Sequence, residues 1–164
     1  MNRQSQLVLD SGRLSIGEKL RGMNWNRGGI LYARTSLGAA FLSAVASRFG
    51  LWDRTLDLKH FANFLVYAGE VNSFLPKEVI PYLAVLATVF ETLFGILLIL
   101  GLWPRWVPLG SAILLAMFGV AMAISFGIKS PMDYSVFSAS GAAVLLTLDS
   151  FRKEKSPPTD WKEN

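Results

Sequence analysis

The chain has 164 residues, of which 52% are hydrophobic and only 17% are charged, so it is too apolar for a typical soluble domain. Its net charge of +4 does not indicate nucleic-acid binding, because the basic residues flank apolar segments instead of forming one binding face. With no cysteine, the chain cannot form disulfides or thiolate metal sites, and its single histidine argues against a multi-imidazole metal centre. The sequence therefore predicts neither a metal site nor a nucleic-acid partner.

The apolar residues gather in segments long enough to cross a lipid bilayer. We predict four spans, at about residues 28–49, 79–102, 106–128 and 132–151. The third has 23 residues without a charge, about 34 Å of helix, and a hydrocarbon core is about 30 Å thick. The fourth is the weakest, because its uncharged core, 134–148, gives only about 22 Å of helix, and a re-entrant or surface helix is the alternative. The predicted fold is an all-α, antiparallel four-helix membrane bundle over residues 28–151.

Basic residues are distributed unequally between the two sides of this bundle. Ten fall on the side of the polar N-terminal segment, 1–27, and of the charged, proline-containing tail, 152–164, which we predict to be disordered. Five fall on the other side, namely Arg48, Arg54, Lys59, Lys77 and Lys129. Because lysine and arginine are enriched in cytoplasmic segments, the count predicts a multi-pass protein of the cell inner (plasma) membrane with both termini cytoplasmic.

The long connection between the first two spans, residues 50–78, has a helical pattern of its own. Its apolar residues recur at helical spacing, at Leu58, Phe61, Ala62, Leu65, Ala68 and Leu75. The residues between them include polar ones such as Lys59 and Glu70. This pattern predicts an amphipathic helix on the outer surface of the bilayer. A lid over a site between the spans is the alternative.

Two charges interrupt the predicted spans. Arg34 lies in the first span, and Glu91 is the only charged residue between Val79 and Pro104. A charge at this depth costs about 2.5–3.5 kcal/mol on insertion scales, so it usually has a partner or a function. Each is followed four residues later by a glycine, Gly38 or Gly95, where another helix can approach closely. We therefore expect Arg34 and Glu91 to form an interior charge pair with the glycines at helix-packing positions.

The pair can be interpreted in two ways. A carboxyl group in an apolar interior can exchange a proton, while an arginine stays charged and can hold a carbonyl or an anion. This chemistry suits a proton-linked site or a quinone site at Arg34 and Glu91. Alternatively, the two residues form a structural salt bridge that fixes helix packing. The residues alone do not decide between these interpretations, and they identify no catalytic residue.

Short motifs in the first two spans and the turn that follows resemble the DoxX family of small four-span membrane proteins. The similarity covers roughly residues 30–148, and its motifs are Arg34-x3-Gly38-x2-Phe41 and Pro81-x9-Glu91-x3-Gly95-x2-Leu98-x2-Gly101-x3-Arg105. The end of the first span departs from the family pattern, because relatives more often have a glycine and a lysine where this chain has Ala44, Ala46 and Arg48.

The resemblance implies a role next to redox enzymes, since the family includes the small subunit of an archaeal thiosulfate:quinone oxidoreductase and is often linked to sulfur or oxidative-stress systems. The sequence-based hypothesis is thus a membrane subunit or accessory of a redox system, with quinone as a possible cofactor and one or more protein partners. The competing hypothesis is a noncatalytic assembly or scaffold subunit. Whether the chain is itself an enzyme stays open.

Overall fold

The structure is a computed structural model that describes residues 25–54 and 57–155. Most of the predicted N-terminal segment, 1–27, and of the predicted tail, 152–164, lies outside the described residues. The chain divides into two compact units between Tyr32 and Ala33. The packing discussed below lies within the second unit, to which all the helices except the first turns of α2 belong.

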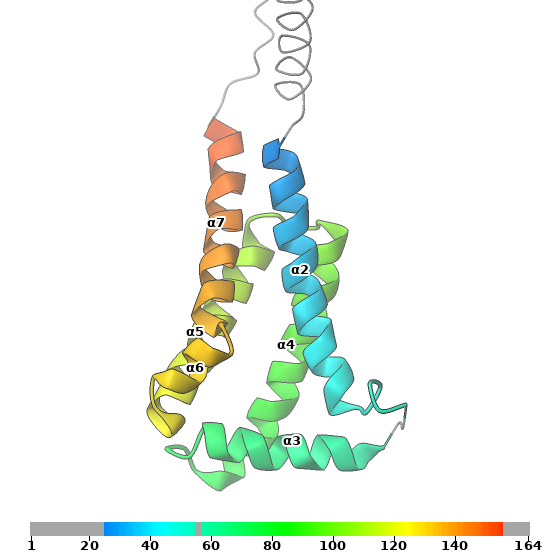
Figure 1. Cartoon of the computed structure of the whole chain (residues 1–164), viewed down its shortest axis with the longest axis vertical. Helices are drawn as coiled ribbons and strands as arrows, with labels where there is room; N and C mark the ends of the chain where they lie inside the picture. The colour runs from blue at the N-terminus through cyan, green and yellow to red at the C-terminus, as the bar shows by residue number, and fades with distance from the viewer. Residues whose placement is uncertain (1–24, 55–56, 156–164) are drawn as a thin grey trace, which may run out of the picture. The chain divides into compact units, whose positions relative to one another are not determined.

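All regular secondary structure in the described residues is helical (Figure 1). The elements in chain order are α2 (Trp25–Arg48), α3 (Leu58–Val71), the short 3-10 helix η1 (Lys77–Val79), α4 (Ile80–Leu100), α5 (Trp106–Phe126), α6 (Lys129–Asp133) and α7 (Val136–Lys155). Three segments are long and apolar enough to cross a membrane: α2, η1 with α4, and α5. Their bounds lie within three residues of the first three predicted spans.

The fourth predicted span differs from the expectation. Instead of one helix over 132–151, the structure has the short α6 and then α7, separated at Tyr134 and Ser135. Ser135 has a positive φ of 55°, which interrupts a right-handed helix. The last turns of α7 carry Asp149, Arg152 and Lys153, so α7 is less apolar than the other long helices. It is not among the three helices that are apolar enough to span by composition.

Helices α4 and α5 are joined by a tight turn. Gly101 ends α4 in the left-handed conformation, with φ of +80°, and its N–H donates to the carbonyl of Leu97 at 2.9 Å. Helix α7 then packs along α5, where the Ser140 hydroxyl donates to the carbonyl of Ala112 at 2.9 Å. The hydroxyl is therefore satisfied although Ser140 is buried.

Helix α3 crosses the ends of α4 and α5 instead of running beside them (Figure 1). Its side chains Phe64, Leu65 and Ala68 pack on Ile80 and Ala84 at the beginning of α4. The next turn of α3 places Val71 against Ala121 and Met122 near the end of α5. The connection predicted to contain a helix therefore contains one, and its apolar side packs on the beginning of α4 and the end of α5.

Helices α2 and α4 come closest at Gly38 and Gly95. A Cβ added to Gly38 would lie 2.7 Å from the carbonyl oxygen of Gly95, and one added to Gly95 would lie 3.1 Å from the carbonyl oxygen of Gly38. Both residues are buried. The two backbones touch here because neither residue has a side chain, as the helix-packing expectation for these glycines requires.

Replacing Gly38 with alanine should destabilise the protein. The new methyl group would meet a backbone oxygen and Ile99 at 2.7 Å, so the helices would have to separate, at a cost of about 1–3 kcal/mol. Gly141→Ala on α7 is the matched control, because a Cβ there meets nothing within 4 Å. Thermal unfolding in detergent, followed by tryptophan fluorescence, should show a lower Tm for Gly38→Ala only. Equal Tm values for the two variants would contradict the close approach.

Candidate functional site: a buried ion pair

One side of α4 is buried along its whole length. Its members recur every three or four residues, at Ile80, Ala84, Thr88, Glu91, Gly95 and Leu98. Glu91 is part of this buried stripe and is only 2% exposed. Since Glu91 lies in a segment apolar enough to span a membrane, its carboxylate needs a partner inside the protein.

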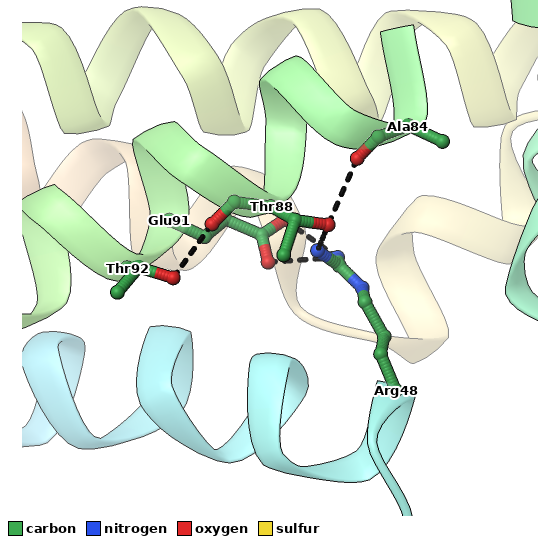
Figure 2. Close-up of polar contacts among 5 residues, drawn as sticks. All are labelled: Arg48, Ala84, Thr88, Glu91 and Thr92. Carbon is green, nitrogen blue, oxygen red and sulfur yellow. Dashed lines mark hydrogen bonds and ion pairs between the residues drawn. The ribbon is translucent and has the colours of Figure 1, made fainter. Parts of the chain in front are cut away.

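That partner is Arg48, the last residue of α2 (Figure 2). Its Nη2 donates a hydrogen bond to Glu91 Oε1 at 2.8 Å and lies 2.7 Å from Glu91 Oε2. The Arg48 side chain is 10% exposed and that of Glu91 is 3% exposed, so the pair is shielded from solvent. Charge-assisted contacts of this length are among the stronger hydrogen bonds in proteins.

Thr88 connects the pair to the backbone of α4 (Figure 2). Its hydroxyl accepts a hydrogen bond from Arg48 Nη1 at 2.9 Å and donates one to the carbonyl of Ala84 at 2.8 Å. The two terminal nitrogens of Arg48 thus bind different groups, one the carboxylate and the other the hydroxyl. This arrangement fixes the plane of the guanidinium.

Helix α3 covers the arginine, and the loop before α3 contacts that helix. The Arg48 Cζ atom lies 3.8 Å from the ring centroid of Phe64, a cation–π contact. The ring of Phe61 stacks on that of Phe49, the residue after Arg48, with centroids 5.9 Å apart. His60 Nδ1 lies 3.8 Å from Asp53 Oδ2, a second contact between α3 and the loop.

One atom of the pair is incompletely satisfied. Glu91 Oε2 is buried and has no hydrogen-bond partner within the described part of the chain, although it lies next to the arginine charge. A carboxylate oxygen can accept two hydrogen bonds, so Oε2 retains the capacity to accept a donor from a ligand or a water molecule. The arrangement can hold a donor group beside a fixed positive charge.

A family model described as DoxX matches residues 29–126, more than half of the chain. The protein belongs to the DoxX family. The match includes α2 from Gly29 onward, α3, α4 and α5, and with them every residue of the Arg48–Glu91 site. A comparison with curated proteins and a comparison with solved structures give no significant match.

The prediction that Arg34 pairs with Glu91 is wrong, because the Arg34 side chain lies at the end of α4. Arg34 Nε donates to the carbonyl of Leu98 at 3.2 Å, and its Nη2 would lie 2.6 Å from a Cβ on Gly101. Leu98 is seven residues, or about 10 Å, further along α4 than Glu91. The DoxX motif residues on the two helices are therefore neighbours, but the two charges among them are not paired.

The error has a physical cause in the direction of side chains. Side chains on a helix lean toward its N-terminus, so on antiparallel α2 and α4 they lean in opposite directions. Arg34 therefore leans away from Glu91, whereas Arg48 leans back along α2 toward it. The sequence reasoning counted Arg48 only as a flanking charge. The signal it missed was this lean.

No group of three or more metal-ligating side chains occurs among the residues that the structure describes.

A double-mutant cycle should show that the pair is strongly coupled. Arg48→Gln alone should cost about 3–5 kcal/mol of unfolding free energy, because it leaves Glu91 buried without a counter-charge. Glu91→Gln should cost a similar amount, because it leaves the shielded Arg48 without its counter-charge. The double variant should cost less than the sum of the two single variants, and the difference gives the coupling energy. Unfolding in mixed micelles of rising dodecyl sulfate content measures these changes.

The exposed pair of Lys129 and Asp133 on α6 is the matched control for this cycle, with side chains 83% and 57% exposed. Its coupling should be about 0.2–1 kcal/mol. A coupling energy for Arg48 and Glu91 no larger than this value would show that the buried pair is not a unit.

Proposed function

We propose that this DoxX protein is a membrane subunit or accessory of a quinone-linked, sulfur or oxidative-stress redox system, and that the Arg48–Glu91 pair contacts the quinone. The observation that carries the proposal is Glu91 Oε2, a buried carboxylate oxygen that lies 2.7 Å from Arg48 Nη2 but accepts no hydrogen bond from the described residues. A quinol hydroxyl can donate one, and it is uncharged, so it can reach a site at this depth from the bilayer.

The neighbouring groups suit the same ligand. A carboxylate can accept a proton from a quinol, and Arg48 stays charged throughout and balances the carboxylate. Aromatic rings of α3 lie next to the pair, with Phe64 on Arg48 and Phe61 on Phe49. Because the chain has no cysteine, electrons would enter and leave through a protein partner that carries the redox group.

The proposal includes a topology of four spans in the inner (plasma) membrane, with both termini cytoplasmic. Helix α7 is the fourth span, as supported by its packing on α5 and by its exposed apolar residues, which include Leu145 and Leu148. The charges near its end, Arg152 and Lys153, then lie on the cytoplasmic side with Arg105. Helix α3 lies at the outer surface.

The alternative is a noncatalytic assembly or scaffold subunit. Its support is that Arg48 has partners for both terminal nitrogens within the protein, namely Glu91 and Thr88. A pair of this kind can fix the packing of α2 and α4 without any ligand.

The topology can be tested with single cysteines, because the chain contains none of its own. Lys59→Cys and Lys129→Cys should react with a membrane-impermeant maleimide added outside intact cells, whereas Lys153→Cys should react only after the membrane is opened. All three positions are exposed. Labelling of residues 129 and 153 from the same side would show that α7 does not cross the membrane.

The function can be tested by purification in a mild detergent, followed by lipid extraction for quinone and mass spectrometry for partners. We expect about one quinone per chain and a redox enzyme as partner. Glu91→Gln keeps the volume of the side chain but removes its negative charge, so it should lose the quinone while retaining the partner. Lys129→Gln, an exposed site on α6, is the control and should behave as wild type.

A different set of results would favour the scaffold hypothesis over the quinone proposal. A non-redox partner, no quinone, and normal assembly and function of Glu91→Gln would reject the quinone proposal and support a structural role for the pair.

A further inference from the structure

Arg34 is a second charge on a span-length helix, and it is separate from the ion pair. It lies in the span-length helix α2, and no carboxylate within the described ranges forms an ion pair with it. Its Nε donates to the carbonyl of Leu98 at 3.2 Å, a neutral acceptor. This carbonyl does not balance the positive charge of Arg34, so the guanidinium can attract an anion.

The position of the guanidinium limits where this anion lies. Arg34 Nη2 lies 2.6 Å from the place where a Cβ on Gly101 would be, so the side chain rests directly on the turn between α4 and α5. Gly101 is glycine for two reasons, its positive φ of 80° and this contact. The guanidinium is therefore held at the end of the helix pair, where a membrane-spanning helix meets the headgroups.

The surface around the turn has features typical of the membrane–water interface. Trp103 and Trp106 are 68% and 69% exposed, and exposed tryptophans are typical of the bilayer interface. Arg105 lies between them and has its guanidinium 5.5 Å from the ring centroid of Phe151. The exposed residues Leu100 and Leu102 provide an apolar surface beside these polar groups.

We propose that Arg34 and the turn Gly101–Arg105 bind the phosphate of an anionic phospholipid, whose acyl chains lie against the exposed apolar residues of α4. The terminal nitrogens of Arg34 donate to the phosphate oxygens, since a guanidinium matches phosphate geometry well. Arg105 adds a second positive charge. The apolar surface next to the turn favours a lipid over a free phosphate ion. This proposal does not depend on the quinone site at Arg48 and Glu91.

The test is native mass spectrometry of the full-length protein in detergent, titrated with phosphatidylglycerol, phosphatidylcholine or inorganic phosphate. The wild type should bind phosphatidylglycerol in preference to phosphatidylcholine and should not bind inorganic phosphate. Arg34→Gln should weaken phosphatidylglycerol binding about tenfold or more, the loss expected for a charge-assisted contact. Arg34→Lys should retain part of the preference, and Lys129→Gln should retain all of it.

Three results would overturn the proposal. One is equal binding of the two lipids by the wild type, which needs no variant and so does not depend on the folding of Arg34→Gln. Another is an unchanged preference in a folded Arg34→Gln protein. The third is displacement of phosphatidylglycerol by millimolar inorganic phosphate, which would assign the site to a soluble anion.

Discussion

Contact between the backbones of α2 and α4 at Gly38 and Gly95 sets the register of the two helices, and the register decides which charges meet. A one-turn slide would bring a side chain of one helix against the backbone of the other. Because both glycines are needed at the same level, the helices have one close arrangement instead of several. In that arrangement the end of α2 lies beside Thr88 and Glu91, and the beginning of α4 extends beyond it.

The part of α4 that extends beyond α2 explains the position of α3. Ile80 and Ala84 lie in this part of α4, and α3 packs on them. The same helix places Phe64 on Arg48. The ion pair is thus shielded in part by a helix that is not among the three candidate spans. This shielding strengthens the attraction within the pair, but it also raises the cost of leaving either charge alone.

Much of the fold follows from the sequence because apolar length is a strong signal. The uncharged run that forms α5 and the helical spacing within residues 58–71 each predicted a helix where the structure has one. The break before α7 was not predicted, since a residue such as Ser135 adopts a positive φ only because of its surroundings. For the site, the sequence identified Glu91 and the two glycines. It did not identify Arg48, because pairing depends on register and on side-chain direction, and these are properties of two packed helices.

The hydroxyls of Thr88 and Thr92 both donate to the carbonyl four residues earlier in α4, so the helix satisfies them by itself. Glu91 is then the one charged residue in α4, a helix apolar enough to cross a bilayer. Thirteen leucine, isoleucine, valine and phenylalanine residues of α4 each favour insertion by about 0.3–0.6 kcal/mol at a helix centre, against about 2.5–3.5 kcal/mol for a charge. Insertion of α4 therefore does not require α2. The carboxylate instead matters for packing, because Arg48 of α2, a helix synthesised before α4, supplies the counter-charge that the sequence of α4 lacks.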